Sequence, residues 1–159
     1  MFMNNHKDTV KELTPLLSGV AGEYFVAAEL SRRGYLASIT LRNTKGVDIL
    51  CSNADATKTI AIQVKTNRRS SREWVLNQKA ESFYATNHYY VFVNLHDSVN
   101  SPDYFIVPSE AVALYVKETH VEWLNTPGKG GRAHIDTPMR KFADTSEKYK
   151  DRWDLLGLQ

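Results

Sequence analysis

Two short apolar segments that carry polar side chains, residues 46–50 and 60–65, constrain the fold of this 159-residue chain more than any other feature. They read Gly-Val-Asp-Ile-Leu and Ile-Ala-Ile-Gln-Val-Lys, and each has the length and apolar content of a buried strand. Because side chains alternate across a strand, Gln63 and Lys65 share one side of the second segment. A core strand has little reason to carry such groups. We therefore predict that Asp48, Gln63 and Lys65 gather at the rim of one sheet.

The first half of the chain predicts one helix followed by three strands. A Thr-Pro pair begins the helix, apolar residues at helical spacing continue it over residues 15–33, and Gly34 ends it. Short strands are expected at 35–41, 47–51 and 59–65. Their close succession predicts an antiparallel meander.

The second half predicts a helix, two strands and two more helices. The first four are expected at 77–86 (helix), 89–95 and 104–107 (strands) and about 110–117 (helix). The strand at 89–95 is almost entirely apolar, which is typical of a strand covered on both faces. The tail ends in an expected helix, where Asp144 and Glu147 have capping-box spacing and Trp153 would dock the helix on the body.

This order of elements predicts the α/β class, with an αβββαβ core in which helices flank a central mixed sheet. The length suits one domain with a real core. We expect that domain to span residues 1–159, with its core at about 15–120 and a C-terminal helical extension at 121–159.

Composition excludes several classes of protein. Apolar residues make up 42% of the chain and charged residues 24%, as in ordinary globular proteins. No apolar run approaches the ~20 residues that span a membrane, and the N-terminus lacks the apolar core of a signal peptide. The single cysteine, Cys51, cannot form an internal disulfide, so we expect a cytoplasmic protein in which Cys51 is a small buried apolar residue.

Basic residues follow the 60–65 segment and recur near the C-terminus. The first group comprises Arg68, Arg69 and Arg72, with Trp74 beside it. The second group comprises Lys129, Arg132, Arg140 and Lys141. These residues are candidates for contacts with a nucleic-acid backbone, and the alternative is a pair of solvated loops. The Gly-Lys-Gly-Gly-Arg stretch lacks the spacing of a Walker loop, and we expect no small organic cofactor.

Each candidate site residue has a structural alternative. Glu23 has apolar or small neighbours three and four positions away, so it needs a partner such as a metal or a lysine unless it lies at an exposed edge. Asp48 could hold Mg²⁺, or it could bond the backbone of its own turn. Gln63 offers a neutral oxygen, or it belongs to the solvent face of an ordinary edge strand.

Taken together, these residues resemble the PD-(D/E)XK, or restriction-endonuclease-like, nuclease superfamily. The resemblance lies in their order: Glu23 in a first helix, Gly-Val-Asp48 in a second strand and Gln63-x-Lys65 in a third. The amino-acid sequence of residues 22–35 is similar to the opening helix of archaeal Holliday-junction resolvases and related small nucleases. The resemblance covers about residues 18–95 and includes the αβββαβ order.

The resemblance implies a site for Mg²⁺, with Mn²⁺ as a substitute. Asp48, the Gln63 side-chain oxygen and the Val64 carbonyl would bind the metal, Glu23 would close the site directly or through water, and Lys65 would orient the attacking water. Gln63 stands where the superfamily more often has Asp or Glu, which removes one negative charge.

The resemblance therefore implies a metal-dependent endonuclease that acts on duplex or branched DNA. Since one site cuts one strand, cutting a duplex or a junction favours a homodimer. Two alternatives stay open: a DNA-binding or regulatory module that does not cleave, with Gln63 marking a weakened site, and an interaction protein with no nucleic-acid role.

Overall fold

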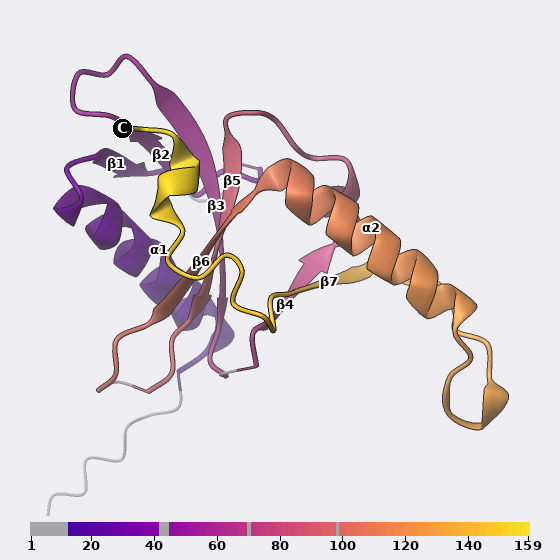
Figure 1. Cartoon of the computed structure of the whole chain (residues 1–159). Coiled ribbons are helices and arrows are strands. Elements are labelled where there is room, and N and C mark those ends of the chain that lie inside the picture. The colour runs from indigo at the N-terminus through magenta and orange to yellow at the C-terminus, as the bar shows by residue number, and fades with distance from the viewer. Residues whose placement is uncertain (1–12, 42–44, 70, 98) are drawn as a thin grey trace, which may run out of the picture.

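A mixed sheet of five strands, in the order β1-β2-β3-β5-β6, forms the centre of the molecule. The computed structural model describes residues 13–41, 45–69, 71–97 and 99–159. Helix α1 (Pro15–Arg32) covers one face of the sheet and helix α2 (Ser109–Asn125) lies on the other (Figure 1). The strands of the sheet are β1 (Leu36–Ile39), β2 (Ile49–Ser52), β3 (Thr59–Asn67), β5 (His88–Asn94) and β6 (Asp103–Pro108).

Helix α1 forms as the sequence predicts, because its ends are set by local signals. The hydroxyl of Thr14 accepts a hydrogen bond from the backbone of Leu17 at 3.2 Å, and proline occupies the first turn. At the other end the N–H of Tyr35 returns to the carbonyl of Leu30, and Gly34 has a φ of +88°. Gly34 thus supplies the left-handed turn that ends the helix.

The predicted antiparallel meander is confirmed. β1 pairs with β2 and β2 with β3 in antiparallel register, while β3 and β5 run parallel and place Gln63 beside Tyr90. β6 returns antiparallel to β5. The segment expected to be covered on both faces, now β5, is indeed largely buried.

Two apolar clusters fill the two faces of the sheet. On the α1 face, Val26 and Leu30 pack with residues of β2, β3 and β5 that include Ile62 and Val64. On the α2 face, residues of β5 such as Tyr90 pack with α2 and with a separate two-stranded ribbon. Because Ile62 and Val64 lie on the α1 side, the residues that alternate with them, among them Gln63 and Lys65, project toward the α2 side.

The ribbon consists of β4 (Glu73–Asn77) and β7 (Met139–Ala143), which are far apart in the sequence but pair antiparallel. The expected helix at 77–86 is therefore wrong: β4 occupies its first residue, and a single turn of 3₁₀-helix, η1 (Gln78–Glu81), follows. The αβββαβ order thus lacks its second helix. Trp74 on β4 and Phe142 on β7 are both buried in one cluster, and this shared burial favours strand pairing over helix.

The prediction of a helical C-terminal extension is also wrong over most of its length. α2 continues to Asn125, but beyond it lie only the 3₁₀ turns η2 (Lys129–Gly131) and η3 (Trp153–Leu156), with β7 between them. The Asp144 carboxylate does accept hydrogen bonds from two later backbone N–H groups, at 3.0 and 2.8 Å, but it closes a turn and not a helix. Trp153 docks on the α1 face as expected.

Cys51 is buried in the α1-side cluster, as predicted for a small apolar residue. Of the helices in the described ranges, none has both the length and the apolar character needed to cross a membrane.

Candidate active site

Asp48 lies where β2 begins, and its side chain bonds to the neighbouring strand. Its Oδ2 accepts a hydrogen bond from the N–H of Val64 at 2.7 Å, and its own N–H donates to the carbonyl of Ile62 at 2.8 Å. The N–H and C=O of one strand residue point to the same side, so the Val64 carbonyl is also directed toward β2. The bond to Val64 is not the local turn contact that the sequence left open as an alternative.

The environment of Asp48 leaves its charge only partly stabilised. Burial raises the pKa of its carboxyl, while the hydrogen bond from Val64 and the positive charge of Lys65 lower it. The net pKa lies above the ordinary value for aspartate. A cation next to this carboxylate would supply the missing stabilisation.

Gln63 and Lys65 line a pocket of about 330 Å³ on the α2 side of the sheet. Its apolar wall includes Tyr90, the register partner of Gln63 on β5, and Phe83. The negative charge of Asp48 acts on Tyr90 as well, although burial is the larger reason that the pKa of Tyr90 rises to about 12. Asp48, Gln63 and Lys65 therefore belong to one electrostatic environment.

The turn that leads into Asp48 is held by His88 and Phe83. The Gly46 carbonyl accepts a hydrogen bond from Nε2 of His88 at 3.0 Å, so this nitrogen carries the proton. Burial lowers the pKa of His88, which keeps the ring neutral at physiological pH. Gly46 has a φ of +73°, and a Cβ there would come within 2.6 Å of the Phe83 ring, so only glycine fits.

Glu23 comes from the opposite side of the sheet. It follows Gly22, which packs against Thr66 on the α1 face of β3, and it is half-buried. Among the described residues, those that line the pocket beside Gln63 do not include Glu23. Its part in the site stays a prediction. Glu29, the next carboxylate along α1, is paired with Arg32 and Arg33 on the helix surface.

The oxygen donors around Asp48 fit a hard cation. The carboxylate of Asp48, the amide oxygen of Gln63 and the carbonyl of Val64 are ligand types that Mg²⁺ accepts together with waters. The described residues hold no group of three His, Cys, Asp or Glu side chains placed to bind a metal. A metal here would thus depend on one carboxylate supplemented by neutral oxygens.

The residues of the first group predicted to contact nucleic acid differ in their exposure. Arg68 and Arg69 are exposed and border an open hollow of about 700 Å³ at the end of β3. Arg72 is instead paired with Glu147 at 2.6 Å, which ties it to the C-terminal segment. Trp74 is buried, and its ring N–H donates to the Val93 carbonyl, so the expectation that it reaches DNA is wrong.

The second basic group does not form one arm. Lys129 and Arg132 are exposed on the loop that extends beyond α2 (Figure 1). Arg140 is only 3% exposed, and Lys141 pairs with Glu73 at 2.8 Å on the ribbon. Arg140 is therefore a structural residue and not a surface contact.

Three residues of this region were not singled out from the sequence. Lys45 and Lys79 line the same pocket as Gln63 and Lys65, and His88 holds the turn before Asp48. For Lys45 the signal was its place directly before Gly46 and three residues before Asp48. For Lys79 and His88 the sequence carries no local signal, because only the fold brings them to Asp48.

Comparisons with known proteins add evidence on the fold. No protein-family model matches the chain, and no curated protein matches it in sequence. Among solved structures, a bacterial homing endonuclease, I-Ssp6803I, superimposes with a TM-score of 0.54 over 91% of this chain and 92% of its own, at 13% sequence identity. In fold, the protein is therefore similar to a nuclease, with a five-stranded mixed sheet between two helices.

Proposed function

We propose that this protein is a metal-dependent DNA endonuclease of the PD-(D/E)XK superfamily. One observation carries the proposal: the Asp48 carboxylate bonds to the backbone of Val64, between Gln63 and Lys65, beside a pocket that both of those side chains line. A structural aspartate would not need a lysine and an amide on the same face of the adjacent strand. The likeness in fold to a homing endonuclease supports the same conclusion.

Asp48, Gln63 and the Val64 carbonyl would hold the metal ion, and Glu23 would close the site directly or through a water. When bound, Mg²⁺ or Mn²⁺ stabilises charge on the scissile phosphate and lowers the pKa of an attacking water. Asp48 must be ionised to bind the metal, and the positive charge of Lys65 favours its ionised form.

Lys65 would act on the reacting groups themselves. Its ammonium group orients the water that attacks phosphorus and stabilises the negative charge that grows on the phosphoryl oxygens. A new P–O bond forms to the water oxygen, the bond from phosphorus to the ester oxygen breaks, and one proton of the attacking water passes through solvent to the ester oxygen, which leaves as a hydroxyl. Lys65 is half-buried at the pocket, so its charge is less screened there than in bulk water.

DNA in duplex or branched form is the proposed substrate, and a second copy of the chain is the proposed partner. A single site cuts one strand, so two sites are needed to cut both strands of a duplex. The exposed Arg68 and Arg69 lie at the end of β3, just after Lys65, where they can contact the backbone of the bound strand.

Gln63 favours a second candidate function, a DNA-binding module that does not cleave. A neutral amide in place of a carboxylate leaves one negative charge fewer for the metal, so affinity for the metal falls. In that case the pocket and the basic residues would bind DNA without hydrolysis.

Cleavage of labelled duplex, branched and single-stranded DNA, with Mg²⁺, Mn²⁺ or EDTA, tests the proposal. We expect metal-dependent cutting that is lost in Asp48→Ala and Lys65→Ala and weakened in Glu23→Gln. Lys148→Ala is the matched control for lysine, since Lys148 is exposed and packs over Tyr149. Cutting that survives in both Asp48→Ala and Lys65→Ala would contradict the proposed site. Binding without cutting in the wild type would favour the non-cleaving module.

A further inference from the structure

The pocket beside Gln63 carries more positive charge than the proposed chemistry uses. Besides Lys65, it is lined by Lys45 and Lys79, and its remaining lining is apolar or amide, with no carboxylate among the described residues. Three lysines that line one pocket of about 330 Å³ give it a positive charge, which favours an anion. The volume is at the lower end of the range for small-molecule sites, about 300–1,000 Å³.

Lys79 reaches this pocket from an element that has little stability of its own. It belongs to η1, a single turn of four residues capped by Asn77, whose side chain accepts a hydrogen bond from the Lys79 backbone at 3.2 Å. Isolated turns of this kind are marginal, so contacts with the rest of the fold must hold η1 in place.

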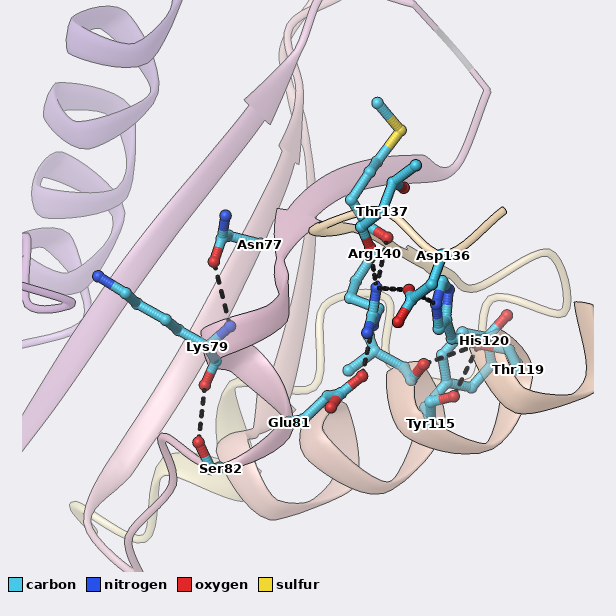
Figure 2. Close-up of polar contacts among 12 residues, drawn as sticks. Asn77, Lys79, Glu81, Ser82, Tyr115, Thr119, His120, Asp136, Thr137 and Arg140 are labelled. Carbon is cyan, nitrogen blue, oxygen red and sulfur yellow. Dashed lines mark hydrogen bonds and ion pairs between the residues drawn. The ribbon is translucent and has the colours of Figure 1, made fainter. Parts of the chain in front are cut away.

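Ala80 of η1 is buried in the α2-side cluster, and the polar contacts of the turn are made largely by Arg140, which is only 3% exposed. Its Nε donates to the Glu81 carboxylate at the end of η1, and its Nη1 donates to the carbonyls of Thr137 at 2.6 Å and Met139 at 3.0 Å. Figure 2 shows these bonds converging on the Arg140 guanidinium, while the Lys79 side chain extends from the other side of the turn. We call the Glu81–Arg140 pair the clasp.

Two further contacts fix the clasp from outside. The backbone N–H of Gln78, at the start of η1, donates to the Pro138 carbonyl at 2.8 Å. The Asp136 carboxylate lies 3.7 Å from Arg140 and is bonded to Nε2 of His120 on α2 at 2.8 Å. The clasp therefore joins η1, the segment before β7 and α2, and it holds the end of the turn that carries Lys79.

We propose that Lys79, together with Lys45, binds a phosphate of the DNA strand beside the one that Lys65 contacts, and that the clasp is the positioning device for Lys79. This inference rests on the proposed function in that it takes DNA as the ligand. It adds one contacted phosphate, held by two lysines, to the site, and it gives the buried Glu81–Arg140 ion pair a role in substrate binding.

Binding of a labelled 20-base-pair duplex in EDTA, measured by fluorescence anisotropy over a series of salt concentrations, tests the proposal without cleavage. We expect Lys79→Ala to weaken binding roughly three- to tenfold and to reduce the slope of log K against log salt by about 0.9, the value for one lost phosphate contact. Lys148→Ala should change neither, and Lys79→Arg should retain the slope. An unchanged slope in Lys79→Ala overturns the proposal.

The clasp is tested with Glu81→Ala, with Glu81→Gln in its place if the alanine variant fails to fold. Either should reduce the salt slope as Lys79→Ala does, and the double variant with Lys79→Ala should bind no worse than Lys79→Ala alone, because both remove the same contact. Glu73→Ala, which removes an exposed pair on the same ribbon, is the control. The clasp is only structural if the losses of DNA affinity from Glu81→Ala and Lys79→Ala simply add. The same holds if Glu81→Ala lowers thermal stability but leaves the salt slope of DNA binding unchanged.

The outcomes separate this inference from the proposed function. If the wild type cuts DNA and Lys79→Ala binds and cuts normally, the inference fails and the nuclease stands. If Lys79→Ala lowers the slope but no protein cuts, the phosphate contact stands and cleavage fails. If the wild type binds no DNA, both fail.

Discussion

The carboxylate of Asp48 and the backbone N–H of Val64 are joined by a hydrogen bond of 2.7 Å across two neighbouring strands. This contact separates the structural role of Asp48 from its charge. An asparagine at position 48 can still accept the hydrogen bond but carries no negative charge, whereas an alanine provides neither the acceptor nor the charge.

Asp48→Asn is therefore expected to be at least as stable as the wild type at pH 7 while losing affinity for Mn²⁺. The native pKa of Asp48 is raised, so ionisation of this group costs stability as pH rises through that pKa, and the neutral amide avoids this cost. Asp48→Ala should lose about 1–3 kcal/mol, because the Val64 N–H is left without its partner. Thermal unfolding in EDTA and calorimetric titration with Mn²⁺ measure both effects. Unchanged Mn²⁺ affinity in Asp48→Asn would remove Asp48 from the metal site.

Gly22 allows α1 to approach β3 closely. A Cβ at this position would lie 1.9 Å from the Thr66 hydroxyl oxygen, and that hydroxyl is buried without a hydrogen-bond partner in the described part of the chain. Gly22→Ala should thus cost about 1–3 kcal/mol through overpacking. Adding Thr66→Ala should restore much of the loss because it makes room for the new methyl group. Urea unfolding of the two single variants and the double variant checks this, and simple additivity would speak against the close contact.

Asp103 makes stability depend on pH at the edge of β6. Burial alone would raise its pKa, but hydrogen bonds from His96 at 2.8 Å and from Lys150, whose nitrogen lies 3.1 Å away, lower it overall. A carboxylate with a lowered native pKa contributes stability above its unfolded pKa and loses it as pH falls through the native value. Asp103→Asn should therefore be less stable than the wild type at pH 7, by about 1 kcal/mol or less, with the difference vanishing in acid. Melting temperatures from pH 3 to 7 measure it. A difference that grows in acid would contradict the assignment.

Cys51 should resist thiol reagents in the native state. It is 1% exposed, and burial raises the pKa of its thiol to about 11. At pH 8 this pKa alone lowers the thiolate fraction about 200-fold compared with an ordinary cysteine, and burial blocks access as well. Labelling with a disulfide reagent should require unfolding by urea. Rapid labelling of the folded protein would show that β2 opens locally.

Local chemistry made several features predictable. The Thr-Pro start and the glycine stop act within one turn, so the bounds of α1 followed from the sequence to within one residue. Alternation of side chains likewise placed Gln63 and Lys65 on one face of β3, where the structure has them line one pocket. Sequence order alone predicted that the strand beside Asp48 neighbours β3 in a meander, which the register confirms, although β2 begins at Ile49 and Asp48 stands directly before it.

Other features depend on residues that meet only when the chain has folded. Trp74 and Phe142 are buried together, and their contact turns two weak segments into the ribbon of β4 and β7, neither of which the local pattern predicted as a strand. Strand pairing over such a distance requires closure of a long loop, and no local pattern reports whether the packing gained exceeds that entropic cost.

For the same reason, one part of the candidate site could be predicted from the sequence and the other part could not. The sequence by itself determined which polar side chains β2 and β3 carry and on which face of β3 Gln63 and Lys65 lie, because the strand period is a property of the local backbone. Only the tertiary structure decided that α1, which carries Glu23, packs on the face of the sheet opposite Gln63 and Lys65, and that Lys79 of η1 lines the same pocket as those two residues. Those placements follow from how helices and ribbon pack on the sheet, and packing is a property of the whole chain.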